Sequence, residues 1–119
     1  MINKIYDIVK LAKDLELDYT DITDLYVSYI DEINSHCHNI KEYFYKNNFV
    51  ELKMEIHNVK GVAANLLLFD VFEETVLLEN LLNHGDFVGS KDHVENLINI
   101  LINSNDKVIQ SFSQVNVIL

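Results

Sequence analysis

The chain of 119 residues contains no proline and only three glycines. Proline breaks helices and glycine favours turns, so a chain nearly free of both has few points at which a helix must stop. Its single cysteine, Cys37, excludes an internal disulfide and fits a reducing compartment. These absences favour a protein made of long helices.

Arginine is also absent, and the excess of acidic residues over lysines gives a formal net charge of −10. Nucleic-acid phosphates would repel such a chain, so we expect no nucleic-acid partner. No signal-peptide pattern opens the sequence, and no apolar run approaches the ~18 residues of a membrane span. We therefore expect a cytoplasmic protein that does not enter a membrane. The length predicts one domain with one core, residues 1–119.

Apolar residues recur at spacings of three and four, which predicts helices along most of the chain. The expected helices are a short one from about Asn3 to Glu16, a long one from about Asp21 to Lys46, one containing Glu51 to Leu66, one from Asp70 to about His84, and a last one capped by Ser90. Residues suited to the breaks between them are Asp18 with Thr20, Asn48 with Glu51, Asp70 with Glu73, and Gly85. Short strands compete only at Leu66–Phe69 and Val115–Leu119. The predicted class is all-α.

The stretch from Glu51 to Leu66 has two different faces when drawn as a helix at about 100° per residue. Five apolar residues form a stripe that must be buried: Leu52, Ile56, Val59, Ala63 and Leu66. His57 lies roughly 140° from the centre of that stripe, so its imidazole is expected to face outward.

Small and basic residues surround His57 on this outward face. Lys53 and Gly61 lie one turn below and above it, Ala64 follows two turns on, and Lys60 flanks it. A glycine inside a helix costs about 1 kcal/mol relative to alanine, so Gly61 requires a reason. Close approach of another molecule to His57 is the reason we favour.

The segment His57-Asn58-Val59-Lys60-Gly61, continuing through Ala63-Ala64-Asn65-Leu66, resembles the signature of histidine-containing phosphotransfer (HPt) domains. These domains relay a phosphoryl group between aspartates of response-regulator receiver domains. The resemblance implies an up-down four-helix bundle with an additional short N-terminal helix, and His57 as the phospho-acceptor. One departure is that the family usually has a second glycine ten residues after the histidine, where this chain has Leu67.

Two charged residues suit this chemistry. Lys60 would compensate the negative charge of a phosphoryl group on His57. The family often has Gln or Glu twenty-two residues after the histidine, so the resemblance implies that Glu79 accepts the Nδ1 proton and leaves Nε2 as the nucleophile. For all three residues the alternative is an ordinary solvated side chain. The receiver would bring its aspartate and Mg²⁺, so we expect a phosphocarrier without its own cofactor or metal, and not an enzyme.

Charge placement supports docking of an acidic partner near His57. Residues 41–60 carry four lysines and three glutamates, a net +1, which leaves −11 for the rest of the chain. A locally basic surface speeds encounter with an acidic pocket, although lysines that only complement helix dipoles are an alternative. We expect Lys53, Gly61 and Ala64 to form the docking face. The expected partners are receiver domains and a hybrid histidine kinase, and the chain is expected to be a monomer.

Two other functions stay open. The chain could be an interaction module that binds receiver or kinase domains without being phosphorylated, or the phosphotransfer module of a larger histidine kinase. The Met1 start and the absence of a kinase region favour a stand-alone protein.

The other four histidines give weaker indications of a functional site. His36, Cys37 and His38 are adjacent, but adjacent helical positions point apart, so we expect no metal site there. No Glu-x-x-His pattern of the di-iron bundles occurs. His84 and His93 are expected near helix ends as solvated or capping groups.

Overall fold

The computed structural model describes residues 5–115, and within that range the chain is helical throughout, without a strand. The helices are α1 (Ile8–Leu15), α2 (Tyr19–Tyr45), α3 (Phe49–Asn65), α4 (Phe69–Asn83) and α5 (Phe87–Ser113). The all-α prediction is confirmed, and the strand considered at Leu66–Phe69 is absent. The expected helix start at Asn3 and most of the second possible strand, residues 116–119, lie outside the described residues. None of the helices in residues 5–115 has the length and apolar character that crossing a membrane requires.

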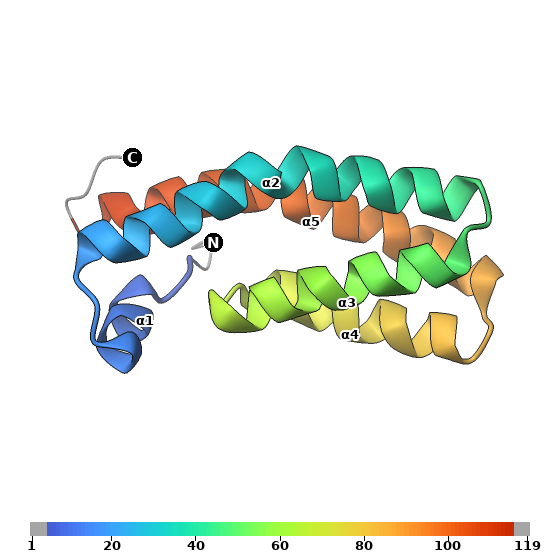
Figure 1. Ribbon diagram of the computed structural model, residues 1–119, viewed down its shortest axis with the longest axis horizontal. Coiled ribbons are helices and arrows are strands. Elements are labelled where there is room, and N and C mark those ends of the chain that lie inside the picture. The colour runs from blue at the N-terminus through green and yellow to red at the C-terminus, as the bar shows by residue number, and fades with distance from the viewer. Residues whose placement is uncertain (1–4, 116–119) are drawn as a thin grey trace, which may run out of the picture.

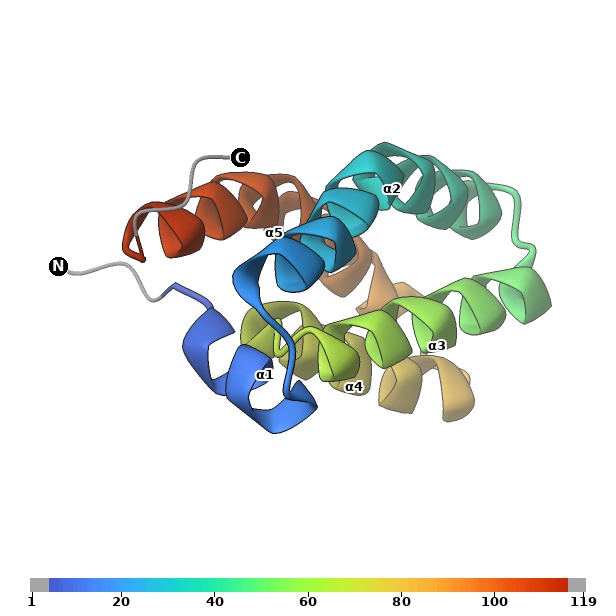
Figure 2. The same ribbon diagram turned by 60° about the vertical axis from the view of Figure 1, so that its left-hand side comes forward.

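Helices α2 and α5 lie side by side, and the shorter α3 and α4 lie beneath them (Figure 1). Each of α2 to α5 packs against two of the other three, in the pairs α2–α3, α3–α4, α4–α5 and α2–α5. The chain reverses direction at each of the three turns between them (Figure 1). Helix α1 packs against α2 and lies at the end where α3 gives way to α4, as Figure 2 also shows.

The core contains the apolar stripes that the spacing predicts. On α3 the predicted stripe is buried in full, from Leu52 to Leu66, with 7% exposure at most. The same spacing predicts buried stripes on the fourth and last helices, and their residues are buried: Val71, Thr75, Leu78, Leu82, Val94, Leu97, Ile98, Leu101, Val108 and Phe112. Val115, predicted to end the last stripe, is partly buried against the core. Because α3 is fixed on both flanks by α2 and α4, the face opposite its stripe is left toward solvent.

The spacing in the first helix predicts a packing face of Ile5, Ile8, Val9, Ala12 and Leu15, and the structure confirms only part of it. Ile8 is buried and Ala12 packs against the core. Val9 and Leu15 are about half exposed, and Leu11 is buried in their place at 4% exposure. A helix of two turns contains too few residues for the period to fix its face, so the contact with α2 decides. The 3/4 spacing of the second helix also predicts burial of Leu25, but this residue is 40% exposed on α2.

Aspartates begin three of the helices. The carboxylates of Asp7, Asp18 and Asp86 accept hydrogen bonds from backbone N–H groups in the first turns of α1, α2 and α5. The prediction of Ser90 as a cap is therefore wrong. Ser90 is buried inside α5, and its hydroxyl donates to the carbonyl of Asp86.

The starts of α3 and α4 also differ from the capping boxes that the sequence indicated. Asn48 stands at the N-cap position of α3, but its side chain makes no capping hydrogen bond. Helix α4 begins one residue before Asp70, with Leu68 at the N-cap position and no side-chain cap. The carboxylate of Asp70 instead contacts Tyr6 and Lys107.

Each of the four turns between the helices contains one residue in the left-handed region: Glu16, Asn47, Leu67 and Gly85. Gly85 has φ +73° after α4, as expected for a residue that follows a helix C-terminus. Leu67, in the turn between α3 and α4, has φ +56°. This conformation is costly for a residue with a Cβ and requires support from its surroundings. The position at which the HPt pattern usually has glycine is thus one where the backbone favours glycine.

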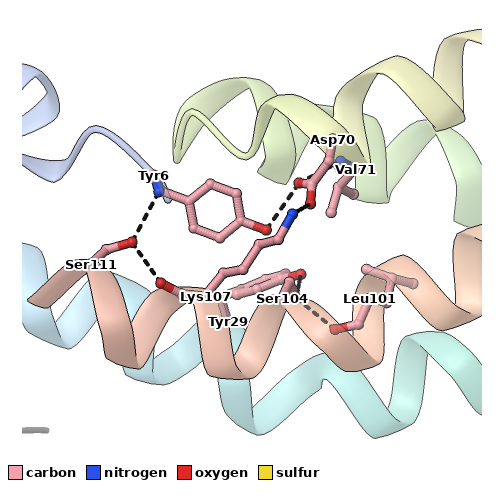
Figure 3. A network of polar contacts seen from close by, with 8 residues as sticks. All are labelled: Tyr6, Tyr29, Asp70, Val71, Leu101, Ser104, Lys107 and Ser111. Atoms are coloured by element: carbon pink, nitrogen blue, oxygen red, sulfur yellow. Dashed lines mark hydrogen bonds and ion pairs between the residues drawn. The ribbon is translucent and has the colours of Figure 1, made fainter. Parts of the chain in front are cut away.

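A polar network joins the segment before α1 to the end of the bundle (Figure 3). The backbone N–H of Tyr6 donates to Ser111 Oγ at 2.9 Å, and its hydroxyl donates to Asp70 Oδ1 at 2.9 Å. Lys107 Nζ donates to Asp70 Oδ2 at 2.6 Å. The network therefore ties the N-terminal segment to both α4 and α5.

Candidate functional site

His57 lies on the outward face of α3, and its side chain is 71% exposed. Its neighbours Ile56 and Val59 are both buried, so the core fixes the rotation of α3 and turns His57 toward solvent. Nδ1 of the ring lies 3.2 Å from Glu79 Oε1 on α4. Nε2 makes no hydrogen bond with any residue in the range 5–115, so it is the accessible nitrogen of the ring.

Glu79 also contacts Lys60. Its second oxygen, Oε2, accepts a hydrogen bond from Lys60 Nζ at 2.6 Å. Glu79 is 19% exposed and Lys60 27%, so this ion pair is partly shielded from solvent. One carboxylate on α4 thus connects the imidazole and the ammonium group presented by α3.

The sequence placed Lys60 and Glu79 beside His57 but did not indicate that they bind each other. The sequence indicated this contact only by the opposite charges of Lys60 and Glu79 on helices expected to be neighbours. The periodicity of each helix gives its own faces only, whereas this contact depends on how far α4 is shifted along α3. The roles proposed for the three residues remain predictions.

The three expected docking residues lie on the same helix as His57. Lys53 is partly exposed, and Gly61 and Ala64 are exposed. A Cβ added to Gly61 would meet no side chain, and no backbone outside its own turn of helix, within 4 Å. The glycine is therefore not required by packing within residues 5–115, and a side chain at this position would extend into open space.

An apolar hollow of about 330 Å³ lies at the end of this face, over the turn between α3 and α4. Its lining residues are Ala63, Ala64, Leu67, Phe69 and Phe72. Ala64 belongs to both the hollow and the expected docking face, so the two are continuous. The apolar run from Leu66 to Phe69 indicated core or a strand, so the sequence did not reveal this hollow.

Two more apolar residues continue the exposed face in the other direction. Val50 is 70% exposed and Met54 63% exposed. With His57, Gly61 and Ala64 they follow the spacing i, i+4, i+7, i+11 and i+14, so they share one side of α3. Met54 lies within the stretch drawn as a helix from the sequence, and extending that wheel by one residue toward the N-terminus would have added Val50.

The remaining histidines on α2 differ from His57. His36 is 13% exposed, and its Nδ1 lies 2.8 Å from Glu55 Oε1. Its Nε2 is buried and makes no hydrogen bond with a described residue, and the Glu32 carboxylate lies 3.7 Å away. His38 is exposed and pairs with Glu42 at 2.8 Å within the same helix. The Glu42 carboxylate also contacts Lys46, so His38 has a carboxylate and a lysine nearby as well, but all three residues lie along α2 and the carboxylate contacts Nε2 of the ring instead of Nδ1.

His84 and His93 also have partners. Nδ1 of His84 lies 2.6 Å from the carbonyl oxygen of Asn80, at the C-terminus of α4 as expected. His93 is not near a helix end; it lies inside α5, with Nδ1 2.6 Å from Oε1 of the buried Glu74. Within residues 5–115 no group of three or more His, Cys, Asp or Glu side chains is placed to hold a metal ion.

Comparisons with known proteins returned no matching family model, no similar curated protein and no similar solved structure.

Proposed function

We propose that this chain is a histidine phosphotransfer protein of a two-component phosphorelay, with His57 as the phospho-acceptor. The observation that carries the proposal is an exposed imidazole whose Nδ1 faces a carboxylate, with Nε2 open and a lysine on the same carboxylate. The packing of α2 to α5 and the reversal of direction between them support an up-down four-helix bundle with α1 as the additional N-terminal helix. This is the fold that the HPt-like sequence pattern implies.

The arrangement suits phosphoryl transfer to Nε2. If Nδ1 carries the ring proton and donates it to Glu79, the Nε2 lone pair is directed outward. That lone pair attacks the phosphorus of an aspartyl phosphate, and the P–O bond breaks with its electron pair passing to the aspartate carboxylate. The reverse step returns the electron pair of the P–N bond to Nε2. No proton needs to leave Nδ1 in either direction.

Phosphoryl transfer depends mainly on positioning and on compensation of charge. Lys60 provides a cation one turn from His57. A receiver domain would provide the second aspartate and Mg²⁺, so this chain needs only a presented imidazole and a nearby positive charge. The chain would therefore act as a phosphocarrier and not as an enzyme, in the cytoplasm, with receiver domains and a hybrid histidine kinase as partners.

The exposed face of α3 supports docking of a macromolecular partner. Gly61 leaves open space beside His57, and apolar surface flanks the histidine at Met54 on one side and at the Ala64 hollow on the other. A partner that covers this face would exclude water from the reacting atoms and hold them in line.

The test is phosphoryl transfer from a receiver domain that has been phosphorylated with radiolabelled acetyl phosphate in the presence of Mg²⁺. We expect the full chain to acquire an acid-labile, base-stable label that maps to His57. The variant His57→Gln should take up no label while its helical signal and melting temperature stay near those of the parent, since the side chain is exposed. Label on another histidine in that variant would contradict the assignment.

A further inference from the structure

Glu79 divides its carboxylate between two partners of unequal strength. The contact from Lys60 Nζ to Oε2 is 2.6 Å, whereas His57 Nδ1 lies 3.2 Å from Oε1. The Lys60 side chain is 27% exposed and the His57 side chain 71% exposed. Shorter and better shielded charge contacts are stronger. Lys60 is therefore the main partner of Glu79, and the imidazole is the weaker one.

This pairing removes the positive charge that a phosphoryl group on His57 would need. A phosphoryl group carries roughly −1.5 to −2 charges at neutral pH. An unpaired Lys60 would place one positive charge near the phosphoryl group, but the charges of Lys60 and Glu79 together sum to zero. Any contact from Lys60 to the phosphoryl group must also be made against the existing 2.6 Å contact with the carboxylate.

We infer that Glu79 sets the phosphoryl equilibrium of the site: by holding Lys60, its carboxylate destabilises phosphorylated His57 and favours onward transfer. The inference rests on the proposed function and adds a direction to it. The chain is then a transient carrier that gives up its phosphoryl group readily. An amide at this position would keep the hydrogen bond to Nδ1 but release Lys60 to the phosphoryl group.

One effect acts in the opposite direction. A phosphorylated imidazole that keeps its Nδ1 proton carries positive charge on the ring, and the Glu79 carboxylate stabilises that charge. This stabilisation is the smaller effect because it acts through the longer contact, on a ring that is largely in solvent. The ring carries at most one positive charge, whereas the phosphoryl group carries nearly two negative ones.

The probe is phosphoramidate, a small phosphoryl donor that needs no docking surface. Nε2 of His57 attacks its phosphorus, the P–N bond of the donor breaks, and the nitrogen leaves as ammonia after taking up a proton. At fixed concentrations of phosphoramidate and ammonium, the phosphorylated share of His57 can be measured by phosphorus NMR. We expect the ratio of phosphorylated to free His57 to rise about tenfold in Glu79→Gln, the size of one released charge contact.

Two further variants show whether the effect acts through Lys60. In a Lys60→Met background, Glu79→Gln should raise the ratio much less than it does in the parent. Glu73→Gln removes the same charge from an exposed position on the same helix and should leave the ratio unchanged. A rise in Glu73→Gln equal to that in Glu79→Gln would mean that net charge alone acts, and would overturn the inference.

The outcomes separate the inference from the proposed function. If the parent takes up a phosphoryl group on His57 and Glu79→Gln gives the same or a lower ratio, the inference fails and the proposed function stands. If the parent takes up no phosphoryl group from phosphoramidate or from a phosphorylated receiver, the proposed function fails and the inference fails with it.

Discussion

The hydroxyl of Tyr6 donates a hydrogen bond to Asp70 Oδ1 at 2.9 Å, joining residues 64 positions apart in the chain. The Tyr6 ring also contacts Phe69 edge-on, with 5.8 Å between ring centroids. Asp70 and Phe69 are the first two residues of α4, and Phe69 lines the apolar hollow beside the candidate site. The segment before α1 therefore supports the turn in which Leu67 adopts a positive φ.

Replacing Tyr6 by phenylalanine should lower the free energy of unfolding by about 1–2 kcal/mol, because a hydrogen bond to a carboxylate is lost from a buried position. Urea denaturation measures the change. Tyr45→Phe is the matched control, since its hydroxyl contacts Glu95 at 3.2 Å on the surface and should change stability by a few tenths of a kcal/mol at most. Equal effects of the two substitutions would contradict the structural role of Tyr6.

Stability should also fall steeply in alkali. Burial raises the pKa of Tyr6, Tyr26 and Tyr29 well above the usual value of about 10. Above pH ~10 the unfolded chain loses these protons while the folded chain keeps them, so the stability present below that pH is lost as the pH rises. Each such tyrosine contributes about 1.4 kcal/mol per pH unit. Urea denaturation at several pH values between 9 and 11 gives the free energy of unfolding as a function of pH. This free energy should fall less per pH unit in Tyr6→Phe than in the parent.

The comparison of the two slopes removes the contribution of the lysines, which begin to lose protons in the same range in both proteins. If Tyr6→Phe and the parent lose stability at the same rate, Tyr6 ionises without unfolding and its buried hydrogen bond is open to solvent.

Periodicity predicted the positions of the four longer helices and the buried face of α3 because these helices pack along their length on neighbours. It predicted the face of α1 only in part, with Ile8 buried as expected but Leu11 buried instead of Leu15, because two turns leave the phase undetermined. It also could not predict that Asp70 would bind Tyr6 instead of capping α4, since that contact depends on residues distant in sequence.

In the candidate site too, some features follow from single-helix patterns and others depend on tertiary packing. The exposure of His57 follows from its place opposite the apolar stripe, which a helical wheel gives directly. The 2.6 Å contact of Lys60 with Glu79 depends on the packing of α3 against α4, and single-helix patterns do not contain that information. The left-handed backbone of Leu67 was indicated only by the glycine expected there from the HPt pattern.

Replacing Lys60 by alanine should slow phosphoryl transfer to His57. A hydrogen bond from a charged group contributes roughly 1.5–3 kcal/mol when it is fully lost. If Lys60 contacts the phosphoryl group mainly in the transition state, the rate should fall by about one to two orders of magnitude. The rate is measured in a single turnover of phosphoryl transfer from a phosphorylated receiver domain.

Glu79→Ala is the comparison for Lys60→Ala. It should slow transfer less, because it removes the partner of Nδ1 but also frees the Lys60 charge for the phosphoryl group. Unchanged rates in both variants would mean that His57 reacts without help from either residue.

Gly61→Leu separates docking from folding. A Cβ at this position meets no side chain and no backbone outside its own turn of helix within 4 Å, so the first atom of a leucine side chain has open space. Glycine is about 1 kcal/mol worse than most residues inside a helix, so the variant should be as stable as the parent or more stable. The new side chain would stand one turn from His57, in the path of a partner's aspartate, and small displacements of reacting atoms cost large factors in rate.

We therefore expect Gly61→Leu to melt at or above the temperature of the parent and to be severely impaired in transfer from a receiver, while phosphoramidate still labels His57. Asn96→Leu places the same side chain on an exposed position of α5 and should transfer normally. Early melting of Gly61→Leu would assign the glycine to packing. Normal transfer would show that the partner does not approach over this face of α3, and the docking role of Gly61 and Ala64 would then be wrong.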